Sequence, residues 1–511
     1  MDSRPGSPPA VSARARANFY GLTRERSGED DKSEFTLVED ISPELVDSVP
    51  NARPGNHPHD VYEAAMASWR FALRTFVMTH LQWESEFIGG MQERVRSPWL
   101  DDYFVYTSSL GTHTFFIIFL PAFFFFGFAE HGRGLLFMLC IGVYVSSVIK
   151  DLLCAPRPFA PPVTRLTIGN HHLEYGFPST HSTNSVSLAL YCHSILYAAY
   201  MTQEVSGSSY LFGVVVLLWY TFSIVYGRLY TGMHSMTDCL VGSTLGASIW
   251  WLHMSYGQAV DNWVVSSGWE VPVILISISI AVINQHPQPI DDCPCFEDAI
   301  ACVAVVAGVM VSRWYTVRIG IDASYFTIRT PGWQKENWEE KLLWVCLSAV
   351  KLIGGLLAIA VWRIVAKLAM HSILPPFFRA LARITSLPNR RFYIPATDYS
   401  RVPTEKTLQP IPSVIDLPST LHAHSVGNLG LPRDAIGNTH LKQRKNAKGS
   451  GGHGTPPSRD DVEEFTAAAD AEPMKHYDAD VVTKAIVYSG IGIIATQITP
   501  IVFELVGVGL N

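Results

Sequence analysis

His234 and Asp238 stand four residues apart, just before an apolar segment of the chain. On a helix, side chains at this spacing share one face, so the carboxylate would lie beside the imidazole. A carboxylate bonded to one ring nitrogen fixes the tautomer and leaves the other nitrogen free to attack an electrophile. The pair therefore predicts a histidine nucleophile oriented by an acid, although Asp238 alone could equally cap the helix.

Three cations, Lys150, Arg157 and Arg228, stand at the ends of other apolar segments. Unpaired cations at a membrane surface are costly unless an anion neutralises them. Guanidinium groups bind phosphate oxygens bidentately, so the three side chains suit a phosphate dianion. Ser179 can add a hydroxyl, and the backbone N–H groups of Ser179, Thr180 and their neighbours would favour an anion if they open a helix. This set predicts a phosphate site that also holds the extra charge of a pentacoordinate transition state.

His181 comes from the same loop as Ser179 and can protonate a departing alkoxide, then deprotonate an attacking water. We expect no metal ion and no cofactor at this site, because cations take the place of a metal and the two loops lack the clustered carboxylates of a Mg²⁺ site. Each residue has a simpler alternative: Lys150 could snorkel at a segment end, and a loop histidine could be solvated. If all of these alternatives held, four unrelated features would have to occur in one region by chance.

The elements that must position these residues are membrane helices. The chain has 511 residues, of which 48% are hydrophobic and only 16% charged, whereas a soluble protein carries about 25% charged residues. The apolar residues form long blocks, which is typical of membrane spans. The net charge of -7 is spread over polar ends and loops and does not indicate a nucleic-acid partner. We predict an all-α, polytopic integral membrane protein with about nine transmembrane helices: 110–128, 133–149, 184–202, 210–226, 239–255, 271–284, 299–312, 342–363 and 485–509.

If successive spans alternate in direction, the loops at 150–183 and 228–238 lie on the same side of the membrane. Counting spans therefore brings all the candidate residues to one membrane face. The arginines and lysine of these loops serve chemistry, so the positive-inside rule does not tell which face this is.

The composition divides the chain into six regions. We expect a disordered polar tail at 1–60, an amphipathic interfacial region at 61–100 and a catalytic membrane core at 101–260. Additional transmembrane helices follow at 261–370, then a disordered polar loop at 371–483 and a C-terminal transmembrane helix at 484–511. Cys293 and Cys295 suggest a metal or redox site only weakly, because no second ligand pair accompanies them.

The motifs resemble a known family. Lys150 to Pro158 reads K-x6-R-P, Pro178 to His181 reads P-S-x-H, and Arg228 to Asp238 reads R-x5-H-x3-D. In this order they resemble the three signature motifs of the type 2 phosphatidic acid phosphatase superfamily, over residues 100–260. The resemblance implies a helical core in which His234 forms a phosphohistidine, His181 is the acid and base, and Asp238 orients His234. It also implies that Lys150, Arg157, Ser179, Thr180 and Arg228 bind the substrate phosphate.

Two positions depart from the family pattern: Gly227 replaces the usual serine, and Thr180 replaces a frequent glycine. Thr180, GMHS at 232–235 and HPQPIDDCPCFED at 286–298 resemble the sphingosine-1-phosphate phosphatase branch with its fungal long-chain base members. That branch implies a sphingosine, dihydrosphingosine or phytosphingosine 1-phosphate substrate, a multi-pass protein of the endoplasmic reticulum membrane and a lumenal site. The alternatives are a broader lipid-phosphate phosphatase, a lipid phosphotransferase, and an inactive lipid-phosphate binder or transporter.

Overall fold

The computed structural model describes residues 54–111, 113–166, 174–322, 324–334, 337–384, 390–394 and 476–510. These residues are helical except for loops and one parallel ladder, in which β1 (Tyr393–Ile394) pairs with β2 (His476–Tyr477). Residues 1–53 of the expected polar tail and most of the expected polar loop lie outside the described residues. All nine segments that were expected to span the membrane fall on helices.

The helices differ in length and in apolar character. In chain order they are α3 (His59–Ala65), α4 (Ser68–Val95), α5 (Pro98–Ser108), η1 (Ser109–Gly111), α6 (His113–Phe125), α7 (Ala129–Leu153), α8 (Thr180–Met201), α9 (Gly207–Tyr230), α10 (Met236–Ser266), α11 (Glu270–Asn284), α12 (Cys295–Arg318), α13 (Trp338–Leu381), α15 (Asp478–Ile493), η7 (Ile494–Ile498) and α16 (Thr499–Leu505). Within the described part of the chain, five helices are long and apolar enough to cross a membrane: α7, α9, α12, α13 and the continuous 478–505.

The count of nine membrane spans is therefore not confirmed, and two of the expected spans are short helices. A bilayer requires about 20 apolar residues, whereas α6 has 13 and α11 has 15. Two boundaries were also wrong. Helix α13 continues to Leu381, so 371–381 is helical and not part of a polar loop, and the C-terminal helix begins at Asp478 instead of 484.

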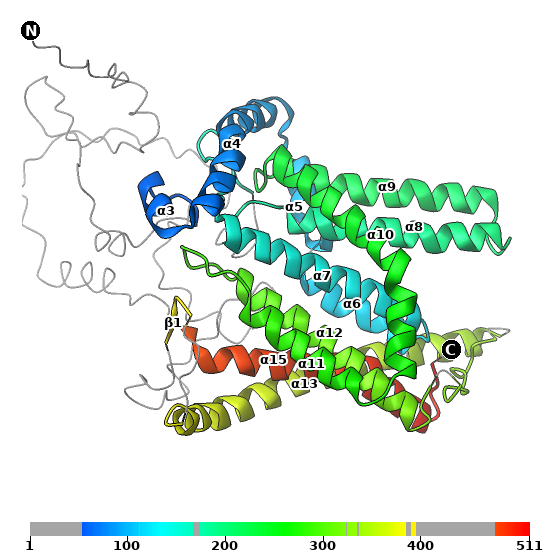
Figure 1. The fold of residues 1–511 in the computed structure, drawn as a ribbon. Helices are drawn as coiled ribbons and strands as arrows, with labels where there is room; N and C mark the ends of the chain where they lie inside the picture. The colour runs from blue at the N-terminus through cyan, green and yellow to red at the C-terminus, as the bar shows by residue number, and fades with distance from the viewer. Residues whose placement is uncertain are drawn as a thin grey trace, which may run out of the picture.

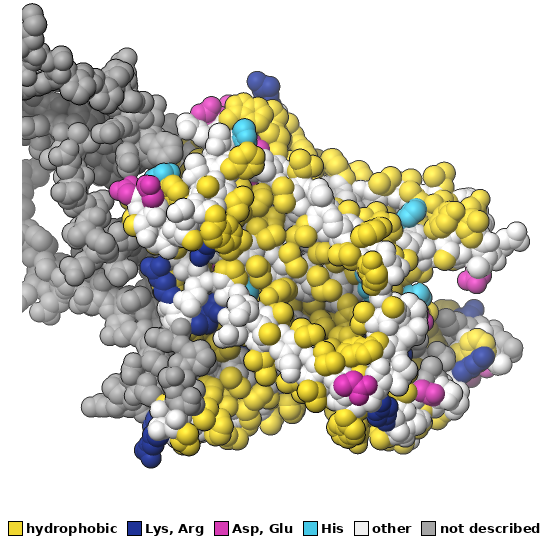
Figure 2. Space-filling model, viewed as in Figure 1, with side chains coloured by type: hydrophobic (Ala, Val, Ile, Leu, Met, Phe, Trp, Pro, Cys, Tyr) yellow, Lys and Arg dark blue, Asp and Glu magenta, His cyan; other side chains and the backbone are white. Residues whose placement is uncertain are grey.

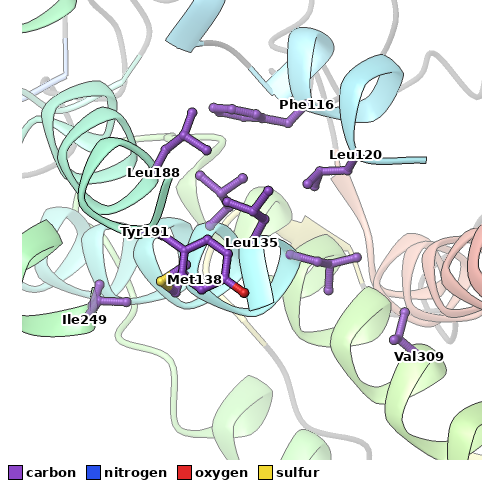
Figure 3. Packing of buried hydrophobic residues seen from close by; sticks show 10 residues of the cluster. Phe116, Leu120, Leu135, Met138, Leu188, Tyr191, Ile249 and Val309 are labelled. Carbon is purple, nitrogen blue, oxygen red and sulfur yellow. The ribbon is translucent and has the colours of Figure 1, made fainter. Parts of the chain in front are cut away.

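A hydrophobic core joins the helices of the first half of the chain to α12. One cluster of buried side chains contains Phe116 and Leu120 of α6 together with residues of α7, α8, α10 and α12 (Figure 3). On the outside, hydrophobic side chains cover the flanks of the helices and charged ones gather toward the two ends, as expected of a protein surrounded by lipid (Figure 2).

Helices α8 and α10 approach each other closely because α10 has glycines at the contact. A Cβ at Gly242 would collide with the Ser179 carbonyl oxygen, and one at Gly246 with that of Thr183. The close contact brings the first turns of α8 and α10 together. The ends of α7 and α9 lie at the same end of the bundle, next to α4 (Figure 1).

Helix α4 lies over this end with its polar side inward. Arg74, Glu84 and Gln92 are buried, whereas Trp69 and Phe76 are exposed. The buried side chains hold loops of the bundle end through hydrogen bonds to Leu153, Cys154, Thr164, Tyr230 and Thr237. The outward aromatic side suits a helix at a lipid–water interface.

Candidate active site

Backbone hydrogen bonds join the loops that carry the predicted site residues. The Ser179 N–H donates to the Asp238 carbonyl oxygen at 3.1 Å, which links the starts of α8 and α10. The His234 N–H donates to the Arg228 carbonyl oxygen at 3.3 Å, which holds the loop between α9 and α10 in a tight turn. This turn needs Gly232, because its φ is +65° and a Cβ there would meet Val163. Segments far apart in the sequence therefore form one site.

His234 is held in a single tautomer. Its Nδ1 lies 2.8 Å from the carbonyl oxygen of Gly176, and because a carbonyl can only accept, Nδ1 carries the proton. The opposite nitrogen, Nε2, lies 3.2 Å from Nη1 of Arg157, a group that can only donate. The lone pair of Nε2 therefore points toward the cations, where a bound phosphate would place its phosphorus atom.

The charge state of His234 suits a nucleophile. Burial, together with the cations Arg157, Lys150 and Arg228, holds the pKa of His234 well below its ordinary value. The imidazole is therefore neutral at neutral pH, and only the neutral ring has a free lone pair.

Asp238 has two tasks in the structure. Its Oδ2 accepts from the Ser235 N–H at 2.8 Å, while the Ser235 hydroxyl accepts from the Asp238 N–H, so the two residues form a capping box at the start of α10. The same Oδ2 lies 3.6 Å from Nδ1 of His234, which is too long for a good hydrogen bond but close enough for a charge interaction. The Gly176 carbonyl, and not Asp238, is therefore the group that accepts the hydrogen bond from the Nδ1–H of His234.

The three predicted cations are buried together. Lys150 Nζ lies 2.6 Å from Oε2 of Glu174, and Nη2 of Arg157 lies 3.9 Å from the same oxygen. Arg157 also donates to the carbonyl oxygens of Glu174 at 3.0 Å and Met233 at 2.8 Å. Nε of Arg228 is buried and makes no hydrogen bond among the residues described. A buried guanidinium nitrogen in this state is suited to an incoming anion.

The second motif opens helix α8. Ser179 is the N-cap residue, whose hydroxyl oxygen accepts from the Ser182 N–H at 3.3 Å, and Thr180 is the first helical residue. Both are buried. His181 is partly exposed and lies close to Gly111 of η1, where a Cβ would touch its ring. The structure thus gives the site a helix N-terminus, which favours an anion, and a histidine with access to solvent.

Sequence reasoning missed three residues that precede the second motif, Glu174, Tyr175 and Gly176. Glu174 is a carboxylate that pairs with the cations, and Gly176 acts through its backbone. The Tyr175 hydroxyl donates to Oδ2 of Asp291 at 2.8 Å and accepts from the Asp291 N–H at 3.0 Å. Only the position of these residues one residue ahead of P-S-T-H could have signalled a role, since a backbone acceptor has no signature in the sequence.

Asp291 is the centre of a buried network that fixes the loop carrying Gly176. Besides Tyr175, its carboxylate accepts from the Tyr62 hydroxyl at 2.9 Å and the Gly55 N–H at 3.0 Å, and it pairs with Nε2 of His57 at 2.9 Å. The network reaches His234 through the backbone that leads from Tyr175 to the carbonyl group of Gly176. Asp291 therefore positions the carbonyl that sets the tautomer of the candidate nucleophile.

We expect Tyr175→Phe and Asp291→Asn each to lower kcat about tenfold or more with little change in KM, because misplacing a catalytic group by about 1 Å can cost as much as 10²-fold. Steady-state kinetics on purified protein would measure the two constants. Tyr144→Phe is the matched control, since its hydroxyl donates to the Val282 carbonyl away from this network. A loss confined to KM, or wild-type kcat in both variants, would rule out the positioning role.

The chain is similar to characterised phosphatases. The family model of the PAP2 superfamily matches residues 131–261. A dihydrosphingosine 1-phosphate phosphatase of Schizosaccharomyces pombe is 30% identical over 85% of this chain and 91% of its own length. Another, from Saccharomyces cerevisiae, is 33% identical over 53% of this chain and 66% of its own length.

Among solved structures, a transmembrane PAP2-type phosphatidylglycerolphosphate phosphatase from Bacillus subtilis matches 38% of this chain and 94% of its own. The two share 21% identity at a TM-score of 0.31. The identity and coverage of the Schizosaccharomyces relative, with the matching family model, decide the assignment. The chain belongs to the PAP2 superfamily, in the family of these dihydrosphingosine 1-phosphate phosphatases.

Proposed function

We propose that this protein is a membrane phosphatase that hydrolyses long-chain base 1-phosphates to the free base and inorganic phosphate. The observation that carries the proposal is the state of His234. The low pKa of His234 keeps the ring neutral, its Nδ1 proton is donated to the Gly176 carbonyl, and its unprotonated Nε2 accepts from Arg157 among the buried cations. The names of the relatives supply the substrate class, because two of them are dihydrosphingosine 1-phosphate phosphatases.

The reaction proceeds in two steps through a phosphohistidine. In the first step, Nε2 of His234 attacks phosphorus, the bond to the lipid oxygen breaks, and His181 donates a proton to the departing alkoxide. In the second step, His181 removes a proton from water, the water oxygen attacks phosphorus, and the bond to His234 breaks to release phosphate. Lys150, Arg157 and Arg228 neutralise the phosphoryl oxygens throughout, with Ser179, Thr180 and the start of α8 around them.

Glu174 gives the cations a counter-charge before substrate binds. A buried cluster of three cations without an anion would be costly. The Glu174 carboxylate neutralises part of this charge through Lys150, so the substrate phosphate must share or displace that contact. Arg228, whose Nε makes no hydrogen bond within the described structure, is free to bind the phosphate without such an exchange.

A substrate panel tests the proposed function. Purified full-length protein, without added divalent metal or acceptor alcohol, would be given dihydrosphingosine, phytosphingosine and sphingosine 1-phosphates, phosphatidate and ceramide 1-phosphate. We expect inorganic phosphate from the long-chain base phosphates with a kcat/KM at least about tenfold above that of the others, as recognition of one polar group can provide. Equal or faster hydrolysis of phosphatidate would contradict the assignment. Phosphate release that requires an added alcohol would indicate a transferase.

The protein is a multi-pass membrane protein by its apolar helices, and we further propose that it resides in the endoplasmic reticulum membrane with a lumenal site. The family resemblance supports this placement. Protease protection of tags inserted at positions 30 and 450, with and without detergent, would locate the two polar segments relative to the membrane. A catalytic loop tag at residue 169 that is cleaved in intact microsomes would place the site on the cytosolic side.

A further inference from the structure

Asp151 directly follows Lys150, yet its side chain takes no part in the phosphate site. It is fully buried, at 0% exposure, and neither carboxylate oxygen has a hydrogen-bond partner in the described structure. The nearest titratable neighbour is His286, whose Nδ1 lies 3.5 Å from Oδ2 of Asp151 but also donates to the Pro287 carbonyl oxygen at 3.1 Å. A buried carboxylate with no hydrogen bond is costly and requires an explanation, of which a bound cation is one.

Two sulfur atoms lie beside this carboxylate. A carboxylate oxygen of Asp151 and the Sγ atoms of Cys293 and Cys295 all lie within 4.8 Å of one another, and all three residues are buried. The two cysteines form a disulfide in the structure. A disulfide is neutral and offers Asp151 neither a charge nor a proton, so this pairing leaves the carboxylate without a partner. The same two sulfurs as thiolates, together with the carboxylate, form a set of three ligands for a metal ion.

We propose that Asp151, Cys293 and Cys295 bind a zinc ion next to the catalytic site. Zinc takes thiolate and carboxylate ligands at about 2.0–2.3 Å, and sulfur ligands exclude magnesium and calcium. His286 faces Oδ2 of Asp151 and would orient the carboxylate. The site needs no new chain segment, since small movements of three side chains bring their atoms onto one ion.

The surrounding charges suit such an ion. Two thiolates and a carboxylate carry three negative charges, of which zinc neutralises two. Arg70 donates to the Asp151 carbonyl oxygen at 3.0 Å, and Arg390 donates to that of His286 at 3.3 Å, so two further cations lie nearby. The Glu297 carboxylate adds one negative charge to this shell. The four negative charges and the four positive charges of zinc, Arg70 and Arg390 then balance, so the zinc form is nearly neutral.

The disulfide and the zinc site interconvert by a balanced exchange. A dithiol reductant supplies two electrons and two protons, the Cys293–Cys295 bond breaks, and the reductant becomes a disulfide. Zinc then displaces the two thiol protons and binds both sulfurs. The ion would join the end of α7, one residue after Lys150, to the segment that carries Asp291, and so fix two parts of the active-site surroundings.

Metal content of the full-length protein in detergent tests this proposal independently of its phosphatase activity. The protein would be reduced, incubated with zinc, desalted and measured by inductively coupled plasma mass spectrometry. We expect about one zinc per chain, and less than about 0.3 in Cys293→Ser/Cys295→Ser and in Asp151→Asn. Cys346→Ser, which removes an exposed cysteine of α13, is the matched control and should keep the metal.

A second set of measurements tests zinc binding on the unsubstituted protein, so it does not depend on the folding of a variant. Cobalt in place of zinc in the unsubstituted protein should give the thiolate-to-cobalt charge-transfer band, and zinc should protect Cys293 and Cys295, but not Cys346, from alkylation. The proposal is overturned by a reduced protein that holds less than about 0.3 zinc per chain, by variants that retain the metal, or by a cysteine pair that stays oxidised in the presence of dithiol.

Discussion

Replacing His234 with alanine is expected to lower kcat by at least about 10⁴-fold, because loss of a covalent nucleophile removes the reaction path itself. The structure supports this magnitude. Nε2 is the unprotonated nitrogen, and in the structure it accepts from the guanidinium of Arg157, whose position a bound phosphate would share. Steady-state phosphate release from a long-chain base phosphate would measure the effect.

The control for this variant lies on the same stretch of chain. His253→Ala changes a histidine of α10 far from the first turn of that helix, in a cavity of about 470 Å³ lined by Arg133, Tyr191 and Asp261. It should retain kcat within about threefold, as substitutions outside the reacting groups usually do. A His234→Ala protein that is folded and keeps more than about 1% of wild-type kcat would refute a nucleophilic role.

The second large effect is expected at Asp238. Asparagine keeps the size of the side chain and can still accept from the Ser235 N–H through its carbonyl, so the cap of α10 should survive. The substitution removes a negative charge 3.6 Å from Nδ1 of His234, where positive charge develops as the ring attacks phosphorus. We expect kcat to fall roughly 10²-fold, as for the loss of one electrostatic contact to a transition state.

This loss is smaller than the roughly 10⁴-fold cost of removing the orienting carboxylate from a serine triad, because there the acid alone fixes the tautomer. Here the Gly176 carbonyl holds the Nδ1 proton at 2.8 Å. The kcat of Asp238→Asn therefore shows whether the Asp238 carboxylate or the Gly176 carbonyl fixes the tautomer of His234. A 10⁴-fold fall would assign the tautomer to the carboxylate, and an unchanged kcat would leave Asp238 with the helix cap alone. Circular dichroism of the variant would show whether α10 remains folded.

Much of the candidate site could be predicted from sequence because its side chains are unusual for their surroundings. Cations such as Lys150 and Arg228 at the ends of apolar segments have few explanations other than an anion, and His234 with Asp238 has the spacing of a helical pair. The helices that carry or adjoin them, α7, α9 and α10, have ends at one end of the bundle, next to α4 (Figure 1). The groups that sequence reasoning missed, such as the Gly176 carbonyl, act through the backbone or through long-range contacts.

The fold was predictable to a similar extent. Apolar blocks predict helices, and each of the nine blocks overlaps at least one helix of the described residues. They do not predict which helices cross a bilayer, since α8 and α10 carry polar residues on the faces that form the site, and α6 and α11 are short. Helix α4 shows a further limit. Its charged Arg74 and Glu84 belong to the region expected at the interface, yet they are buried because the loops of the site supply their partners.

The most direct test of the proposed chemistry is to trap the covalent intermediate. Full-length protein would be mixed with a long-chain base phosphate labelled in the phosphate group, quenched within the first turnover, and digested under alkaline conditions that preserve phosphohistidine. We predict acid-labile label on the peptide containing His234, at the Nε2 position, with none in His234→Ala. Label on another residue, or label that persists in His234→Ala, would contradict the assignment of His234 as the nucleophile.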